Sequence, residues 1–290
     1  MPPSTAPPSL PPNLTTHTQL LSPISLNASP YLPALFKLLN HCFDISHNPP
    51  GHSYLPHSST SRLKTYTQLS EEIGPDGFTI IMLAQDTSTQ AHSLSSSEER
   101  KQETVIATAS AKPYTPPRPS SSNNNSSPGK KEEENNEKAS ELFKRQPGTD
   151  TDAALAAYAE LPKWEILCMV VEPGLQGRGI AGQLMDLIIQ EIEHRVRGAE
   201  KNKGGGKGEG EGEGEGEGKG MGGNGHGDER EGGKKEKTEI LLLLSTLLEI
   251  NQSYYQKRGW ETSNIRNFPP GTMGSRDGFG VVEMMKVVRL

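Results

Sequence analysis

The chain has 290 residues, of which only 31% are hydrophobic and 5% aromatic, so part of it cannot bury enough apolar surface to fold. Its formal net charge of −6 argues against nucleic acid as the main partner. Its 2 cysteines exclude a disulfide framework and favour a reducing compartment, so we expect a cytoplasmic or nuclear protein.

Three stretches of low complexity are expected to be disordered. The first is a leader over residues 1–22, rich in proline, serine and threonine, which lacks the basic start and apolar core of a secretion signal. The second spans about residues 115–160. The third spans residues 198–237, where glycine and glutamate alternate as in a flexible spacer. Residues 23–290 are then expected to form a single domain that the last two stretches interrupt as surface insertions.

The ordered remainder begins with a helix and two strands. Apolar residues at helical spacing predict a helix over about residues 30–43, with Ser29 as its N-cap and Pro30 at its first position. Residues 77–85 and 103–114 have the composition of strands and are joined by a polar loop. We therefore expect these two strands to pair in the antiparallel sense.

A run of apolar residues over 163–171 predicts a central strand. Alternation assigns its side chains to two faces, namely Ile166, Cys168 and Val170 on one and Leu167, Met169 and Val171 on the other. A strand that is apolar on both faces is covered on both sides. We expect Cys168 to be a small buried residue of this strand rather than a nucleophile.

The rest of the chain predicts a helix, a strand, a short helix and a final strand. The helix over residues 180–196 should bury a stripe made of Ile180, Leu184, Leu187, Ile188 and Ile192. Residues 238–245 form a second doubly buried strand, too short to cross a bilayer. A short helix should start at the N-cap Asn251 and end at a left-handed Gly259, and residues 278–290 close the chain as a strand. The expected fold is a mixed α/β sheet with helices packed on it.

The segment LQGRGIAGQL, residues 175–184, lies where the central strand gives way to a helix. Glycines let a ligand approach the backbone, and the unpaired N–H groups of a helix start, with the positive end of its dipole, bind phosphate. The residues expected to contribute are Gln176, Gly177, Arg178, Gly179, Ile180, Ala181 and Gly182. A tight turn that binds nothing is the alternative.

The same glycines also satisfy G-x-G-x-x-G, the pattern of dinucleotide-binding folds. Several residues separate Val171 from the first glycine, the preceding strands look antiparallel, and no acidic residue ends a second strand at the expected spacing. A nucleotide-dependent oxidoreductase using NAD(P) is therefore the more remote alternative. A P-loop is excluded, because no Lys-Ser/Thr pair follows the last glycine.

Two motifs in this order resemble the GNAT N-acetyltransferase superfamily. EILCMVVEPGLQGRGIAGQLMDLIIQ is similar to the family's acetyl-CoA motif of strand, Q/R-x-x-G-x-G/A and helix. NQSYYQKRGW is similar to the later helix, with Tyr255 four residues before Gly259 and Trp260. The resemblance is specific over about residues 165–190 and 245–260, and elsewhere it rests on the order of elements. It implies a mostly antiparallel sheet flanked by helices, and the long insertions depart from the family pattern.

The resemblance implies how acetyl-CoA would be held. The strand edge at Met169, Val170 and Val171 would pair with the pantetheine amides, and the loop residues 176–182 would hold the diphosphate. A backbone N–H at Met169 or Val170 would stabilise the oxyanion. Asn251 is a further candidate for contact with the cofactor.

The resemblance also implies direct attack of a primary amine on the thioester. Tyr255 would donate a proton to the leaving thiolate, while the neighbouring Tyr254, about 100° away on the helix, would serve packing. Glu165 would accept a proton from the amine, directly or through water. Glu172 and Glu249 are weaker alternatives for that base.

The acceptor amine, whether of a small molecule or a protein, is not readable from these residues. A GNAT-like module that binds CoA or a partner without catalysis stays open beside the enzyme. The histidines show no metal-ligand spacing, so we expect no metal, and neither a membrane nor a nucleic acid is expected as a partner.

Overall fold

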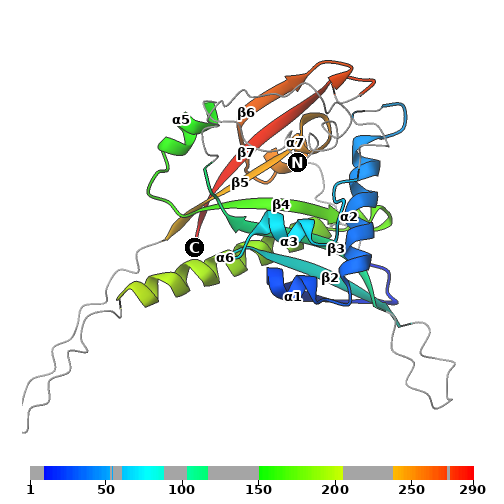
Figure 1. The fold of residues 1–290 in the computed structure, drawn as a ribbon, viewed down its shortest axis with the longest axis horizontal. Coiled ribbons are helices and arrows are strands. Elements are labelled where there is room, and N and C mark those ends of the chain that lie inside the picture. Colours follow the sequence, from blue (N-terminus) through cyan, green and yellow to red (C-terminus); the bar gives the residue numbers. More distant parts are fainter. Residues whose placement is uncertain are drawn as a thin grey trace, which may run out of the picture.

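A seven-stranded sheet forms the centre of the molecule (Figure 1). The computed structural model describes residues 10–52, 54, 61–87, 103–116, 150–204, 238–272 and 275–290. The described strands are β1 Leu14–Leu21, β2 Phe78–Asp86, β3 Glu103–Pro113, β4 Lys163–Val171, β5 Glu239–Leu247, β6 Glu261–Phe268 and β7 Phe279–Arg289. They lie in the order β1-β2-β3-β4-β5-β7-β6, and only β4 and β5 pair in the parallel sense. The predicted class, a mixed and mostly antiparallel sheet flanked by helices, is confirmed.

Helices cover both faces of the sheet. They are α1 Pro23–Asn27, α2 Leu32–His47, α3 Gln68–Ile73, α5 Asp150–Ala156, α6 Ile180–Gly204 and α7 Leu248–Gln256. The long helix α6 packs on one face, and α1, α2 and α3 pack on the other. The side chains of β2 show why two layers form, because they alternate between two hydrophobic cores. Phe78 and Met82 point into the core between the sheet and α6, called the α6 core, whereas Ile81 points into the core between the sheet and α2, called the α2 core.

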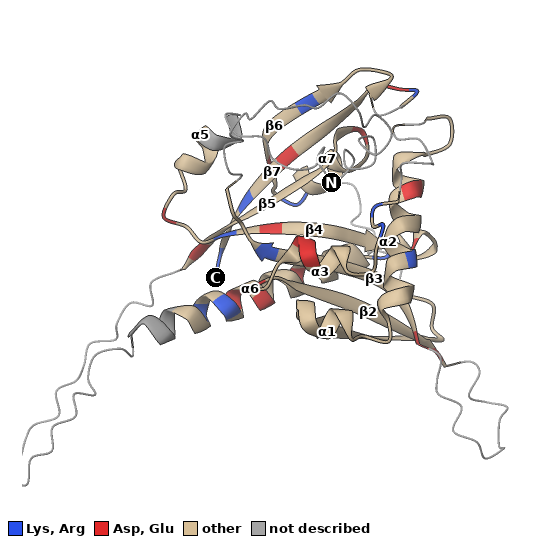
Figure 2. Cartoon of the chain, in the orientation of Figure 1, with Lys and Arg blue, Asp and Glu red and all other residues tan. Residues whose placement is uncertain are grey.

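The predicted stripe of α6 is buried as expected. Ile180, Leu184, Ile188 and Ile192 are each at most 3% exposed, and Leu187 is partly buried beside them. Burying one such side chain contributes roughly 1.5–3 kcal/mol, so the stripe fixes the helix on the sheet. Charged residues of both signs lie along the rest of α6 (Figure 2).

Strand β4 is not a regular strand, because Cys168 adopts a φ of 50°. It is the one non-glycine residue with positive φ in the described ranges, and a side chain in this region costs on the order of 1–2 kcal/mol. The pairing of β3 with β4 shifts register at this point, between Thr108 and Ser110. This is a β-bulge, and its extra residue moves the side chains that follow it to the opposite faces of the sheet.

The bulge makes the predicted assignment of faces in β4 wrong. Ile166, Met169 and Val171 pack with the α6 core, whereas Leu167, Cys168 and Val170 pack with the α2 core. Leu167 and Cys168 therefore lie consecutively on one side. The middle of β4 is also half-buried rather than fully covered, because it borders a cavity.

Strands β4 and β5 pair only where they begin. Residues 163–165 lie opposite residues 241–243, and the register ends there. On the other side of β4, the ladder with β3 continues to Val171. The two parallel strands consequently diverge toward their carboxyl ends, and the edge of β4 that faces β5 has no strand partner beyond Glu165.

Three predicted boundaries are wrong. Residues 14–21 of the expected disordered leader form β1, which pairs with β2 along its whole length. This edge strand exposes one face to solvent, so its polar composition resembles that of a loop. Helix α5 forms inside the expected insertion 115–160, and α6 continues past residue 198 to Gly204. Residues 1–9, 117–149 and 205–237 lie outside the described residues.

Two predicted caps are also wrong. Helix α2 begins at Leu32, and the Ser29 hydroxyl instead accepts the N–H of Tyr31 in the turn that follows α1. Helix α7 begins at Leu248, which places Asn251 inside it rather than at its start. The left-handed Gly259 is confirmed, with a φ of 78°.

Candidate active site

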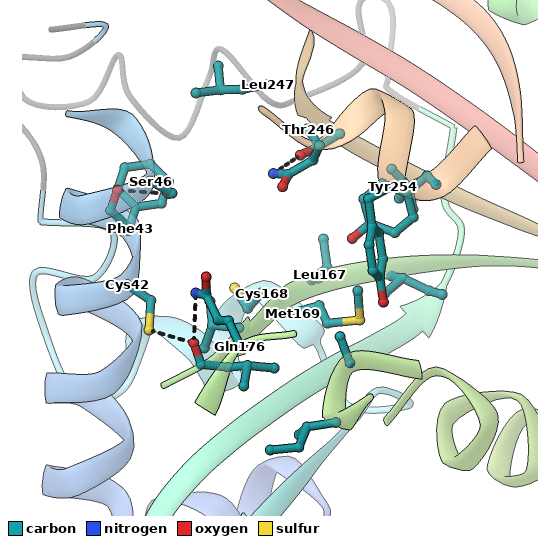
Figure 3. A pocket seen from close by; sticks show the side chains of 18 of the residues that line it. Cys42, Phe43, Ser46, Leu167, Cys168, Met169, Gln176, Thr246, Leu247 and Tyr254 are labelled. Atoms are coloured by element: carbon teal, nitrogen blue, oxygen red, sulfur yellow. Dashed lines mark hydrogen bonds between the residues drawn. The ribbon is translucent and has the colours of Figure 1, made fainter. Parts of the chain in front are cut away.

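A cavity of about 720 Å³ lies between the diverging ends of β4 and β5 (Figure 3). Its walls come from β4, from the loop of residues 176–179 that we call the glycine loop, from the first turn of α6, and from α7 and α2. The predicted site residues that line it are Glu165, Met169, Val170, Val171, Gln176, Gly177, Gly179, Ile180, Ala181, Gly182, Asn251 and Tyr255. Arg178 is the one predicted site residue that does not line it.

The glycine loop has the backbone that its sequence predicts. Gly177 and Gly179 have φ values of 76° and 84°, which side chains with a Cβ rarely adopt. The carbonyl of Gly179 accepts the N–H of Gln183 at 3.1 Å, which is the first helical bond of α6. The N–H groups of residues 180–182 have no carbonyl partner within the helix, because they belong to its first turn, and these residues line the cavity. This helix start can hold an anion.

Gln176 fastens the glycine loop to the end of β4. Its Nε2 donates to the carbonyl oxygen of Val171 at 3.1 Å, and the thiol of Cys42 donates to the same oxygen at 3.5 Å (Figure 3). Helix α2, β4 and the loop therefore meet at one atom. Burial raises the pKa of the Cys42 thiol to about 12, so this thiol stays a protonated donor.

Tyr255 reaches the cavity from α7 and is 8% exposed. Burial, followed by the neighbouring Tyr254, raises the pKa of the Tyr255 phenol above its ordinary value. Its hydroxyl therefore stays protonated at neutral pH and can donate a proton. The phenol is thus in the protonated state that a general acid needs, while its raised pKa makes it a weaker acid than a free tyrosine.

The expectation that only one of the two tyrosines faces the cavity is wrong. Tyr254 also lines it, and its ring meets that of Tyr255 edge to face at 5.1 Å between centroids. The cavity borders two adjacent sides of α7, so positions 100° apart on the helix both reach it. Asn251 lines it from the same helix and donates to the hydroxyl of Thr246 at 2.8 Å (Figure 3).

Glu165 is the one predicted carboxylate that lines the cavity. Its Oε2 lies 3.4 Å from Nζ of Lys112, and the side chain is 15% exposed. Lys112 also donates to the carbonyl of Glu72, whose carboxylate pairs with Arg62. Glu249 instead accepts the N–H of Gly280 at 2.7 Å. Of the three predicted carboxylates, Glu165 alone lies beside the cavity, paired with Lys112.

None of the predicted site residues belongs to α2, which supplies one wall of the cavity. Phe43, Ser46 and His47 line the cavity from its last two turns. Nδ1 of His47 lies 2.7 Å from the carbonyl oxygen of Phe43, so that nitrogen carries the proton. Burial lowers the pKa of His47 to about 4, and the ring is neutral at physiological pH. Only the helical spacing of α2 could have indicated these positions, and it does not show which side meets a ligand.

Two further properties bear on the class of protein. In the ranges that the structure describes, no group of three or more His, Cys, Asp or Glu side chains could hold a metal ion. None of the described helices combines the length and apolarity needed to span a membrane.

A comparison with solved structures finds several to which this chain is similar. An aminoglycoside 6'-N-acetyltransferase complexed with coenzyme A is 10% identical, with a TM-score of 0.39 over 93% of this chain and 96% of its own. A ribosomal-protein-alanine N-acetyltransferase from Brucella melitensis is 12% identical, with a TM-score of 0.40 over 93% and 99%. Arabidopsis thaliana NAA60 in complex with a bisubstrate analogue is 10% identical, with a TM-score of 0.43 over 94% and 99%. No family model matches the sequence, and no curated protein matches it either.

Proposed function

We propose that this chain is an N-acetyltransferase of the GNAT type, which transfers an acetyl group from acetyl-CoA to a primary amine. The observation that carries the proposal is one cavity that joins the unpaired edge of β4, the glycine loop at the start of α6 and the buried Tyr255. These features match the parts of an extended thioester donor: the diphosphate suits the glycine loop, the pantetheine suits the edge of β4, and the thioester would lie near Tyr255.

The donor would lie along the cavity from the glycine loop to Glu165. Its diphosphate would occupy the helix start at residues 177–182, where backbone N–H groups and the helix dipole favour negative charge. Its pantetheine amides would pair with the free edge of β4 at residues 169–171. Gln176 holds the loop to this edge through Val171, so the two parts of the donor site keep a fixed relation.

The transfer would proceed by direct attack. The amine nitrogen attacks the thioester carbon, and the oxygen gains charge that the backbone N–H of Met169 stabilises by roughly 3 kcal/mol. The N–H of Val170, the other predicted donor, points toward β3, because Glu172 two residues later donates to Ile106 in the same ladder. The carbon–sulfur bond then breaks, and the thiolate takes the proton of Tyr255. Glu165 takes a proton from the amine, directly or through water, and exchange with solvent restores both side chains.

The fold argues against the oxidoreductase alternative. A dinucleotide-binding domain is built on a mostly parallel sheet, whereas β4 and β5 are the one parallel pair among the described strands. A module that binds CoA without catalysis has the same cavity, and activity measurements separate it from the enzyme.

The decisive experiment measures release of free thiol from acetyl-CoA in the presence of a panel of amines and peptides. Release that depends on the acceptor is expected, together with a rise in melting temperature on adding CoA but not NAD(P). Binding of CoA without release for any acceptor would favour the non-catalytic module. Absence of CoA binding would overturn the proposal.

A further inference from the structure

Arg258 lies at the rim of the same cavity, just beyond the end of α7. Its guanidinium carbon lies 3.7 Å from the centroid of the Tyr254 ring, and Nη1 donates to the Tyr254 carbonyl at 3.3 Å. Stacking on an aromatic face and a hydrogen bond to the backbone restrict the orientation of this side chain. Arg258 is exposed, and these two contacts hold its guanidinium against the ring of Tyr254.

The guanidinium is directed at the first turn of α6. Nη2 of Arg258 lies 3.9 Å from the position that a Cβ on Gly182 would occupy. Gly182 has no side chain, so the guanidinium packs directly beside the first turn of α6 at the edge of the cavity. A group bound at the N–H groups of this turn would have the guanidinium next to it.

Arg258 is not neutralised by an ion pair in the described parts of the chain. Arginines elsewhere have carboxylate partners, such as Glu72 for Arg62 and Glu191 for Arg195. Arg258 uses one nitrogen on a carbonyl, and no carboxylate there forms an ion pair with it. Asp186, one turn beyond Gly182 on α6, lies near the same ring: it raises the pKa of Tyr254, whereas Arg258 lowers that pKa. The remaining nitrogens of Arg258 can bind an anion.

We infer that Arg258 is a phosphate-binding residue of the diphosphate site, beside the first turn of α6. This inference rests on the proposed function, because it takes coenzyme A as the ligand. The backbone N–H groups of residues 180–182 and the neighbouring planar guanidinium would both contact the diphosphate. The site then discriminates between donors by their phosphates: coenzyme A gains from Arg258, and pantetheine alone does not.

The test compares Arg258→Gln with the unaltered protein in binding to CoA, dephospho-CoA and pantetheine. Loss of a charge-assisted hydrogen bond should weaken CoA and dephospho-CoA by about tenfold or more and leave pantetheine unchanged. Arg197→Gln is the matched control, because Arg197 lies far along α6 in an exposed pair with Glu193 and its loss changes the net charge equally. That variant should bind all three ligands as the unaltered protein does.

Other outcomes would overturn the inference. Equal binding of CoA by Arg258→Gln would show that the residue does not contact phosphate. Weaker binding of CoA with unchanged dephospho-CoA would move the contact to the 3′-phosphate. Equal loss for pantetheine would show a structural role. Absence of CoA binding by the unaltered protein is a separate result, which refutes the proposed function itself.

Arg258→Lys provides a second measurement that does not depend on removing the charge. Lysine keeps the cation but lacks the planar fork that stacks on Tyr254 and binds phosphate at two nitrogens. CoA affinity should fall between those of the unaltered protein and Arg258→Gln, with a melting temperature close to that of the unaltered protein. A Lys variant as weak as the Gln variant would contradict an electrostatic contribution.

Discussion

The backbone N–H of Trp260 donates to the carbonyl of Tyr255 at 3.2 Å, and the two rings meet edge to face with centroids 5.7 Å apart. The left-handed Gly259 turns the chain back after α7, which makes this contact possible. Trp260 is 3% exposed and belongs to the α6 core, so it fixes the ring of Tyr255 from the side away from the cavity. The helix end and the candidate acid are therefore one structural unit.

Tyr255→Phe tests the proposed acid. The ring contacts with Trp260 remain, and no described hydrogen bond of the hydroxyl is lost, so the melting temperature should change little. Loss of a general acid should lower kcat by roughly 10²-fold or more, with CoA affinity unchanged. Steady-state kinetics and calorimetric binding check both parts. Tyr254→Phe is the companion variant, and a larger loss of kcat there would assign the acid to Tyr254.

Gly177→Ala tests the backbone of the glycine loop. Nothing lies within 4 Å of a Cβ built on Gly177, so the cost of the exchange comes from its φ of 76° alone, about 1 kcal/mol or more of unfolding free energy. Displacement of the loop should also weaken CoA binding. Gly174→Ala, equally open in space and without a positive φ, should leave stability and CoA affinity unchanged. Denaturant titration of both variants makes the comparison, and equal costs would contradict it.

Glu165→Gln tests the proposed base with a side chain of the same shape. If the carboxylate takes the proton of the amine, kcat at neutral pH should fall by about 10²-fold or more while the KM for acetyl-CoA stays constant. The loss should shrink at high pH, because an amine of pKa about 10.4 then deprotonates in solution. Glu172→Gln, at the end of the same strand but outside the cavity lining, should change kcat less than about twofold by the same reasoning. A pH-rate profile in which Glu165→Gln runs parallel to the unaltered enzyme would argue against this assignment.

His47 should make the fold less stable in mild acid. Burial, with a smaller contribution from Arg62, lowers the pKa of His47 to about 4 from its ordinary value of 6.5, whereas the Phe43 carbonyl and Asp44 act the other way. Between pH 6.5 and pH 4 the imidazole is protonated in the unfolded chain but not in the folded protein, so the unfolding free energy falls as the pH falls. The loss between pH 7 and pH 5 should be about 2 kcal/mol.

Denaturant titrations at pH 7 and pH 5 measure this dependence. His47→Gln should show a smaller loss than the unaltered protein over the same interval. His41→Gln, which changes an exposed position on the same helix, should keep the full dependence. If His47→Gln retained the whole loss, other groups would be responsible for it.

Local sequence determined the elements that carry the candidate site. The apolar run at residues 163–171 forms β4 with the bounds expected, and the stripe of α6 is buried as its spacing predicts. Gly177 and Gly179 have the positive φ that a loop between strand and helix needs. Backbone conformation and helical periodicity depend on near neighbours, so they can be read from the chain alone.

Only the tertiary structure decided which side chains share the cavity. The bulge at Cys168 depends on the partner strand β3, and it places Met169 on the face of Ile166, whereas regular alternation predicted the face of Leu167. His47 reaches the cavity from a distant part of the chain, and Arg258 comes within reach of Gly182 only once α7 packs beside α6. These relations depend on packing between segments far apart in sequence, for which periodicity and local composition carry no signal.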